Sequence, residues 1–297
     1  MSRWLVTGAG GMLGRDVVEV LSGTPGVAVT GLARAALDVT DAAAADTAVA
    51  GHDVVVNAAA WTDVDGAERA EAGATRVNGE GARSLAAACA RHGAVLLQVS
   101  TDYVFPGDAT RPYREDAPTG PVNAYGRGKL AGELAVRELL PDYGFVVRTA
   151  WLYGAYGRNF VSTVLGLAAQ RDTLDVVDDQ VGQPTWSRAL AVRLSALGGA
   201  ALAGRAPAGV YHATSTGQVT WYGLARAAFA LSGLDPERVR PTTSEHFVRP
   251  APRPSYSVLG HDGWSRAGMP PMKDWRTELA AALPVMAAAA AASSPPA

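Results

Sequence analysis

A short apolar segment near the start of the chain leads directly into a glycine-rich loop, and this pairing restricts the fold more than any other feature. Residues 3–7 form the apolar segment, and the loop that follows has glycines at Gly8, Gly11 and Gly14. Apolar side chains within 17–21 then predict an amphipathic helix. A strand, a glycine loop and a helix in this order present free N–H groups and a positive dipole end to a pyrophosphate. The loop is therefore predicted to bind a dinucleotide, the alternative being an ordinary turn.

Strand-like runs alternate with helical patterns over the first half of the chain. The runs at 27–33, 53–57 and 94–99 are rich in apolar and β-branched side chains. Alternation of this kind, continuing to about residue 150, is typical of a parallel sheet with right-handed crossovers. We predict an α/β fold of the Rossmann type, a doubly wound parallel sheet with a smaller, discontinuous substrate-binding domain.

The second half of the chain has a less regular pattern. A strand at 209–213 is expected to return to the sheet, while helices at 160–170 and 220–231 belong to the smaller domain. The proline-rich stretch at 248–256 is expected to cover the crevice. The predicted division is a dinucleotide-binding domain over 1–150 with a returning segment at 207–216, a substrate domain over 151–206 and 217–288, and a flexible tail over 289–297.

The residue at the end of the second strand bears on the choice of cofactor. An acidic side chain at this place binds the ribose hydroxyls of NAD, but this chain has Arg34. A guanidinium suits a 2′-phosphate, so NADPH is the predicted cofactor. NADH stays the alternative, because a surface arginine or dual use fits the same residue. Asp38 and Val39 are expected to contact the adenine side by their position.

Small side chains follow the third strand. The segment consists of Ala59, Ala60, Trp61 and Thr62. Small residues at the carboxyl end of a strand let a flat cofactor lie across the sheet edge, where open α/β sheets bind their ligands. We predict that this segment lines the cofactor, although an ordinary loop between a strand and a helix has a similar composition.

A tyrosine and a lysine four residues apart supply candidate acid–base chemistry. Tyr125 and Lys129 share one face of a predicted helix. A cation held nearby favours the ionised phenol and is expected to bring its pKa down from about 10 toward the working range. A hydroxyl at the end of the fourth strand, from Ser100 or Thr101, is able to bond the same substrate oxygen. The alternative is a half-buried tyrosine beside a solvated lysine.

The order of these motifs resembles the extended short-chain dehydrogenase/reductase superfamily, and within it the dTDP-4-dehydrorhamnose reductase family. The likeness covers most of the chain and includes further motifs at 57–68, 100–105, 148–153, 159–160, 179–185 and 253–259. The resemblance implies that hydride passes from a nicotinamide to C4 of a dTDP-linked 4-keto-6-deoxy sugar. A tyrosine then gives the proton to the oxygen, and the implied product is dTDP-L-rhamnose or a close analogue.

The resemblance also implies roles for individual residues. Tyr125 is the implied proton donor, Lys129 tunes it and holds the nicotinamide ribose, and Thr101 polarises the carbonyl. With the residues named above, the predicted cofactor-binding set is Gly8, Gly11, Met12, Leu13, Gly14, Arg34, Asp38, Val39, Ala59, Ala60, Trp61, Thr62, Tyr125 and Lys129. The predicted substrate-binding set is Thr101, Asp102, Trp151, Asn159, Gln183 and Arg253. Trp151 also fits plain core packing.

One of two compared positions departs from those relatives that form a magnesium-bridged dimer. Such relatives carry acidic residues at both places, whereas this chain has Asp16 and Arg188. A cation at Arg188 disfavours a metal ion, so no metal site is predicted. The predicted assembly is a monomer or a homodimer that is not bridged by magnesium.

Composition limits the partners and the location. A net charge of −2 over 297 residues gives no reason to expect nucleic acid or an anionic membrane as a partner. The single cysteine, Cys89, lies in an alanine-rich helical stretch and predicts a buried thiol in a reducing cytoplasm. No apolar stretch is long and unbroken enough to span a bilayer, and the first residues do not read as a signal peptide. A cytoplasmic location is therefore expected.

Other functions stay open on the sequence. One is a related enzyme acting on another nucleotide sugar, such as an epimerase, a dehydratase or a reductase of the streptose type. A dehydratase ordinarily needs further carboxylates, and only Asp102 stands beside Thr101. Another is a non-catalytic, NADP-binding regulatory subunit, because a fold does not fix a function. The presence of Thr101, Tyr125 and Lys129 together weighs against that interpretation.

Overall fold

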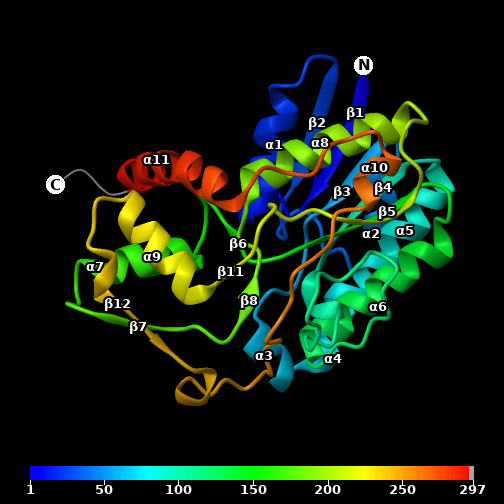
Figure 1. Ribbon diagram of the computed structural model, residues 1–297. Coiled ribbons are helices and arrows are strands. Elements are labelled where there is room, and N and C mark those ends of the chain that lie inside the picture. The colour runs from blue at the N-terminus through cyan, green and yellow to red at the C-terminus, as the bar shows by residue number, and fades with distance from the viewer. Residues whose placement is uncertain (294–297) are drawn as a thin grey trace.

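Six parallel strands form the central sheet of the protein, which a computed structural model describes over residues 1–293 (Figure 1). The strands are β1 (Ser2–Thr7), β2 (Val27–Leu32), β3 (Val54–Asn57), β4 (Val95–Thr101), β5 (Gly144–Thr149) and β10 (Gly209–His212). Their order is β10-β5-β4-β3-β1-β2, and every neighbouring pair is parallel. The predicted Rossmann-type sheet is confirmed, and the predicted returning strand is β10, which pairs with β5.

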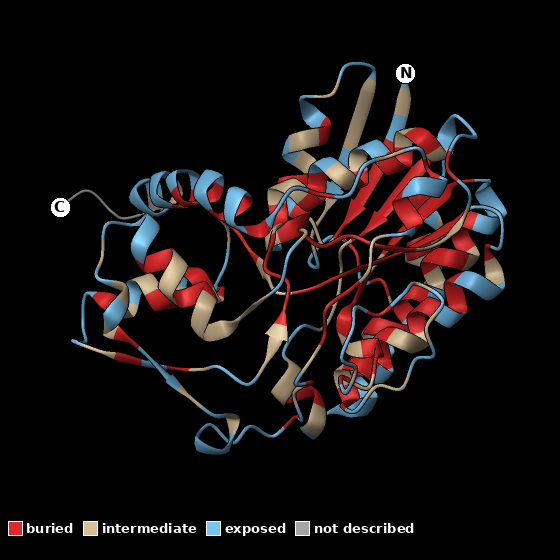
Figure 2. Cartoon of the chain, viewed as in Figure 1, coloured by how far each residue is buried: buried red, intermediate tan, exposed pale blue. Residues whose placement is uncertain are grey.

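Helices cover both faces of the sheet. One face carries α1 (Met12–Ser22), α8 (Ser187–Leu202) and α10 (Gly263–Arg266), and the other carries α2 (Ala42–Val49), α5 (Gly81–His92) and α6 (Ala124–Leu139). Alternate side chains of a strand point to opposite faces, so Trp4 contacts the first layer and Leu5 the second. Strands covered on both sides need continuous apolar runs. This explains the fully buried valines at 54–56, and Figure 2 shows the inner strands of the sheet as mostly buried.

The chain reverses its direction of winding in the middle of the sheet. β2 lies on one side of β1 and β3 on the other. Connections diverge at such a point and leave a crevice outside the carboxyl ends of the strands. The segments that follow β3 and β4 at this edge are α3 (Val64–Arg69), α4 (Glu71–Thr75), the π-helical turn η1 (Arg76–Glu80) and the 3-10 turn η2 (Asp102–Val104).

A second group of elements has its own apolar clusters, separate from those of the sheet. Its helical segments are α7 (Phe160–Ala168), α9 (Trp221–Leu231), α11 (Trp275–Ser293), η3 (Pro236–Arg238) and η4 (Ser244–His246). Its paired strands are β6 (Leu152–Tyr153) with β9 (Thr185–Trp186), β7 (Leu174–Val177) with β12 (Val239–Thr242), and β8 (Val181–Gly182) with β11 (Val219–Thr220). Figure 1 shows this group beside the sheet.

Residues 249–259, which we call the strap, connect the two groups. The Tyr256 N–H donates to the Gly107 carbonyl at 3.0 Å, and the Ser257 N–H donates to the Val181 carbonyl at 2.9 Å. Gly107 has a φ of +86°, and a Cβ there would lie 2.1 Å from Cβ of Pro254, so only glycine permits this approach. The proline-rich stretch is therefore fixed by hydrogen bonds to both groups.

The C-terminal helix extends into the segment that was predicted to be a flexible tail. α11 continues to Ser293, so the first residues of the predicted flexible tail, from residue 289, are helical. Alanine has the highest helix propensity, and this stretch is almost entirely alanine. Residues 294–297 of that prediction lie outside the described residues. Over residues 1–293, no helix is both long enough and apolar enough to cross a membrane.

Two adjacent glycines of α8 give opposite predictions. A Cβ on Gly198 would lie 2.3 Å from the ring of buried Trp4, whereas Gly199 has nothing within 4 Å. We expect Gly198→Ala to lower the free energy of unfolding by about 1–3 kcal/mol through overpacking. Gly199→Ala should raise it by up to about 1 kcal/mol through helix propensity. Urea denaturation measures both, and a Gly198→Ala protein as stable as wild type would contradict the close packing of α8 on β1.

Candidate active site

The loop between β1 and α1 admits only glycine at two positions. Gly8 has a φ of +69°, and a Cβ there would lie 2.6 Å from the backbone nitrogen of Ala59. A Cβ on Gly14 would lie 2.2 Å from the carbonyl oxygen of Gly8. Gly11 precedes α1 and supplies no side-chain cap, so first-turn N–H groups stay available to an external anion. This cradle fits a pyrophosphate and holds the predicted residues Gly8, Gly11, Met12, Leu13 and Gly14.

A row of buried polar side chains crosses the carboxyl edge of the sheet. Thr7 Oγ1 donates to Asn57 Oδ1 at 2.6 Å, and Asn57 Nδ2 donates to Gln98 Oε1 at 2.7 Å. Asn57 Oδ1 also accepts from the Ala59 N–H at 3.1 Å. These side chains come from β1, β3 and β4. The row therefore fixes the start of the predicted cofactor loop at 59–62 against three strands.

Asn78 holds the same loop from the other side. It is buried on η1, its Oδ1 accepts from the Trp61 N–H at 2.9 Å, and its Nδ2 donates to the Trp61 carbonyl at 3.1 Å. π-Helical turns are frequent at functional sites. Asn78 is missing from the predicted set, because an asparagine in a helical pattern does not show that it bonds a backbone across the fold. Its only sequence signal is an amide side chain within an otherwise helix-forming stretch.

The residues predicted for the adenine side lie at the end of β2. Arg34 is exposed, and Val39 is buried. Asp38 Oδ1 accepts from the Thr40 N–H at 2.9 Å and from the Thr40 hydroxyl at 2.8 Å. These bonds lower the pKa of Asp38, and the guanidiniums of Arg76 and Arg34 lower it further. Two cations therefore act on one small region beside β2, which suits a phosphate.

Helix α6 carries Lys129 into a buried position at the edge of the sheet. Its Nζ donates to the Val99 carbonyl of β4 at 2.6 Å. Burial lowers the pKa of Lys129 to about 8, and the carboxylate of Glu133 opposes that shift. The ammonium is therefore mostly charged at neutral pH.

The phenol of Tyr125 has a raised pKa, which corrects the sequence prediction. Burial raises this pKa to about 12, the carboxylate of Asp102 adds to the shift, and the Thr101 hydroxyl opposes it. The prediction counted only the neighbouring cation, whereas the Lys129 ammonium bonds to a backbone carbonyl and burial has the largest effect on the pKa of the phenol. At neutral pH the phenol is protonated, which is the form that donates a proton.

The end of β4 places a hydroxyl and a carboxyl next to this phenol. Thr101 Oγ1 donates to Asp102 Oδ1 at 2.9 Å. Burial raises the pKa of Asp102 to about 6, while the hydroxyls of Ser257 and Thr101 offset part of the shift. Ser100 is engaged elsewhere, because its hydroxyl donates to Glu133 at 2.5 Å. The structure therefore favours Thr101 over Ser100 as the hydroxyl beside the phenol.

A buried ion pair fixes α6 against the strands that carry this site. Glu133 of α6 accepts from Arg148 Nε at 2.9 Å and from its Nη2 at 2.7 Å, and both side chains are almost fully buried. Ser100 of β4 bonds the same carboxylate. A bidentate pair of this kind is geometrically specific. Glu133 is missing from the residues predicted from the sequence, although a glutamate four residues after Lys129 on the same helical face is a usable signal.

Trp151 combines a strained backbone with a close aromatic contact. Its φ of +46° lies in the left-handed region, which is costly for a bulky side chain. The ring stacks on Trp221 with a centroid separation of 3.5 Å, and a Cβ on Gly182 would lie 2.4 Å from it. Trp151 is only half-buried. The Trp151 ring is therefore packed against Trp221 but is not fully enclosed in an apolar core.

Two predicted substrate residues serve the fold instead. Asn159 caps α7, where its Oδ1 accepts from the Ser162 N–H at 3.0 Å and its Nδ2 donates to the Gly154 carbonyl at 2.9 Å. Gln183 is buried and bonds the backbone of Leu259 in both directions, at 2.8 Å and 3.2 Å. Both amide groups are therefore already bonded within the chain, and both side chains are buried. Their place in a motif did not reveal these bonds.

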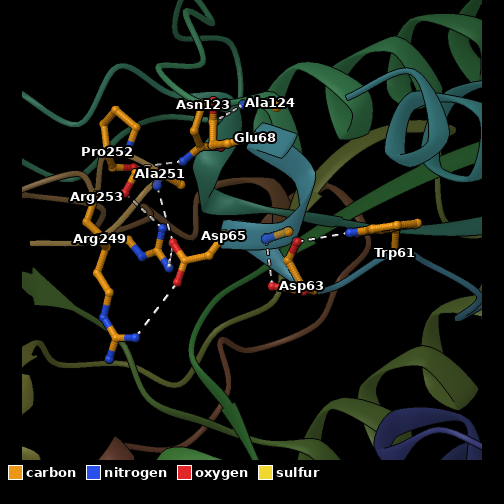
Figure 3. Close-up of polar contacts among 11 residues, drawn as sticks. Trp61, Asp63, Asp65, Glu68, Asn123, Ala124, Arg249, Ala251, Pro252 and Arg253 are labelled. Carbon is orange, nitrogen blue, oxygen red and sulfur yellow. Dashed lines mark hydrogen bonds and ion pairs between the residues drawn. The ribbon is translucent and has the colours of Figure 1, made fainter. Parts of the chain in front are cut away.

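Arg253 lies on the strap and is paired with Asp65 of α3 (Figure 3). Its Nη2 donates to Asp65 Oδ1 at 3.0 Å, and its Nη1 donates to the Ala251 carbonyl at 3.0 Å. The charge of Arg253 lowers the pKa of the Tyr103 phenol, and the charge of Asp65 raises it. The Tyr103 ring meets the ring of Tyr125 edge-on at a centroid distance of 6.0 Å. Arg253 is therefore linked to the surroundings of Tyr125 through Tyr103.

The two places that were compared with a magnesium-bridged dimer hold bonds between α1 and α8. Asp16 Oδ2 accepts from the Ser187 hydroxyl at 2.5 Å. Arg188 Nη1 pairs with Glu19 Oε1 at 2.6 Å. Both side chains therefore have partners within the chain.

Known proteins with similar sequences and structures bear on this site. The chain matches the family described as RmlD substrate binding domain over residues 2–288. It is 60% identical over 286 residues to a dTDP-4-dehydrorhamnose reductase of Streptomyces griseus, covering 96% of this chain and 94% of that protein. It is 51% identical over 288 residues to a dTDP-4-keto-6-deoxy-D-glucose reductase of Streptomyces niveus, covering 96% and 97%. A crystal structure of dTDP-4-dehydrorhamnose reductase from Bacillus anthracis in complex with NADP has a TM-score of 0.90 at 36% identity, covering 95% and 99%.

The raised pKa of Asp102 predicts a pH-dependent loss of stability. Its folded-state pKa of about 6 lies above the ordinary value of 3.8, so the contribution of this group is complete at low pH and is lost as the pH rises through 6. The amide introduced by Asp102→Asn cannot ionise. Between about pH 4 and pH 8, this variant should therefore gain stability relative to wild type by about 3 kcal/mol at most. Urea denaturation at both pH values measures the free energy of unfolding of the variant and of wild type. The same difference between the two proteins at both pH values would contradict the raised pKa.

Proposed function

Because the chain belongs to the RmlD substrate-binding-domain family, we propose that it is an NAD(P)H-dependent reductase of dTDP-linked 4-keto-6-deoxy sugars. The proposed reaction reduces the C4 keto group, as in the conversion of dTDP-4-dehydrorhamnose to dTDP-L-rhamnose or a close analogue. One observation carries the proposal. The Thr101 hydroxyl interacts with the Tyr125 phenol at the carboxyl end of β4, where Lys129 bonds the Val99 carbonyl, and the glycine cradle follows β1 of the same parallel sheet.

NADPH is the proposed cofactor, and when bound it supplies hydride to the C4 carbon. The N-terminal turn of α1 would hold its pyrophosphate, because Gly8 and Gly14 leave space that a Cβ would fill. Arg34 and Arg76 beside β2 would hold the 2′-phosphate. NADH is the alternative cofactor if these arginines do not bind a phosphate. Lys129 would hold the nicotinamide ribose. We assign these contacts to residues 1–150 with the returning segment 207–216, and assign the dTDP-sugar to residues 151–206 and 217–288.

Tyr125 is the proposed proton donor to the C4 oxygen. Its pKa of about 12 keeps the phenol protonated at neutral pH, so a proton is present before the carbonyl oxygen gains charge. The Thr101 hydroxyl has one proton, which is now directed to Asp102, and it would turn to the carbonyl oxygen when substrate is present. The Lys129 ammonium would then stabilise the phenolate that remains.

Asp102, Trp151 and Arg253 are the proposed substrate-side contacts. Asp102 adjoins the phenol, and Trp151 supplies a half-buried aromatic ring against which a sugar packs. Arg253 supplies a guanidinium near Tyr103, and the diphosphate of a dTDP-sugar suits such a group. Asn159 and Gln183 are left out of this set, because their amide groups bond within the chain.

The proposed setting is the cytoplasm, with the enzyme as a monomer or as a homodimer that magnesium does not bridge. The reduced, buried thiol of Cys89 supports a reducing compartment, and burial raises its pKa to about 12. The bonds of Asp16 to Ser187 and of Arg188 to Glu19 support an assembly without bridging metal.

The phenol of Tyr125 gives the most direct kinetic prediction. Tyr125→Phe keeps the ring but removes the proton, so kcat for dTDP-4-keto-6-deoxy sugars should fall by about 10²–10⁴-fold. The dissociation constant for NADPH should stay within about 2-fold, since the glycine cradle is unchanged. Loss of NADPH absorbance measures turnover, and fluorescence titration measures binding. A wild-type protein that binds NADPH tightly and reduces none of these sugars would overturn the enzyme assignment in favour of a regulatory subunit.

A further inference from the structure

Two carboxylates of the short helix α3 bind two different parts of the protein (Figure 3). Asp65 and Glu68 are three residues apart, so both lie on one side of the helix. Asp65 Oδ1 accepts from the Arg253 guanidinium at 3.0 Å and from the Ala251 N–H at 3.2 Å, both on the strap. Glu68 Oε1 accepts at 2.7 Å from the N–H of Ala124, the first residue of α6. The helix therefore bonds the strap with one side chain and α6 with the other.

Asn123 supplies the third link. It precedes α6 and is fully buried, and its Oδ1 accepts from the Gly126 N–H at 2.8 Å. Its Nδ2 donates to the carbonyl of Pro252, in the middle of the strap, at 3.0 Å. The start of α6 is thus bonded to α3 and to the strap, and α3 is bonded to the strap. The three segments close a ring of hydrogen bonds.

The ring of hydrogen bonds includes Ala124, the residue immediately before the proposed proton donor. Ala124 precedes Tyr125, so a displacement of the first turn of α6 displaces the phenol by a similar amount. The Ala124 N–H belongs to the donors that have no partner within a helix, and a carboxylate is the favoured acceptor at that end. On the strap side, the charged pair is largely sheltered, with the side chains of Arg253 and Asp65 20% and 22% exposed.

We infer that Asp65, Glu68 and Asn123 form a positioning ring that couples the placement of Tyr125 to the placement of the strap. Glu68 and Asn123 are the positioning residues for the phenol, and Asp65 is the positioning residue for Arg253 and the strap. Neither carboxylate needs to touch substrate or cofactor for this role. The inference rests on the proposed function for its kinetic consequence, since a misplacement of about 1 Å in an active site costs about 10²-fold in rate.

The chain offers a matched control on the same first turn of α6. Glu71 of α4 bonds Arg127 at 2.7 Å and 3.0 Å, and the two side chains are 47% and 44% exposed. It is a carboxylate of similar reach from the neighbouring helix, but it bonds a solvent-exposed side chain instead of the backbone at the helix start. Removing Glu71 therefore removes an ion pair without opening the ring.

Kinetics should separate these variants. Glu68→Ala should lower kcat by about 10–100-fold with the KM for NADPH within about 2-fold, because the cofactor cradle is untouched. Glu68→Gln retains an amide oxygen that accepts from Ala124, so it should stay within about 3-fold of wild type. Glu71→Ala should stay within about 2-fold. Equal losses for Glu68→Ala and Glu71→Ala, or a Glu68→Gln protein as impaired as Glu68→Ala, would overturn the positioning role.

Amide hydrogen exchange tests the coupling without any turnover. Glu68→Ala should raise exchange in peptides covering 121–130 and also in those covering 249–256, and Asp65→Ala should raise it in both as well. Glu71→Ala should leave 249–256 unchanged. Exchange that rises only at the segment bonded to the mutated side chain would overturn the ring. If wild-type protein reduces no dTDP-sugar, the proposed function fails, while this experiment still decides the coupling.

Discussion

The active site depends on how closely helix α6 approaches the backbone of its neighbours. A Cβ on Gly126 would lie 2.2 Å from the carbonyl oxygen of Tyr103, and one on Gly132 would lie 2.3 Å from that of Asn78. These glycines let the helix lie against η2 and η1 at distances that no other residue permits. Tyr125 and Lys129 stand on the same helix, so this approach brings them to the end of β4. The position of both side chains therefore depends on the close packing of α6 against η1 and η2.

Burial then sets the protonation of the groups that the helix brings together. It raises the pKa of the Tyr125 phenol and the Asp102 carboxyl and lowers that of the Lys129 ammonium. In each group the largest cause is the loss of water, and neighbouring charges come second. The result at neutral pH is a protonated phenol and a mostly charged ammonium on one helix. A reductase that must give a proton to an oxygen needs this combination.

Local sequence rules predicted the parts of the molecule that depend on local geometry. Strand and helix periodicity indicated the parallel sheet and the returning strand β10, and glycine spacing indicated the cradle at Gly8 and Gly14. The same rules did not reveal the hydrogen bonds made across the fold. Asn159 and Gln183 were assigned to substrate because a motif does not show which backbone groups an amide already bonds. Asn78 was not predicted, and Glu68 was part of a motif but had no predicted role, because the backbone groups that they bond are distant in the sequence.

In the proposed reaction, α6 places the Tyr125 phenol where it protonates the C4 oxygen of a dTDP-4-keto-6-deoxy sugar. The most direct measurement is a crystal structure of the Tyr125→Phe protein with NADPH and the keto sugar, in which turnover is slowed. We expect the C4 oxygen to lie within hydrogen-bond distance of Thr101 Oγ1, about 3 Å, and to face the edge of the ring from which the hydroxyl was removed. A C4 oxygen that faces another proton donor and lies more than about 5 Å from residue 125 would contradict it.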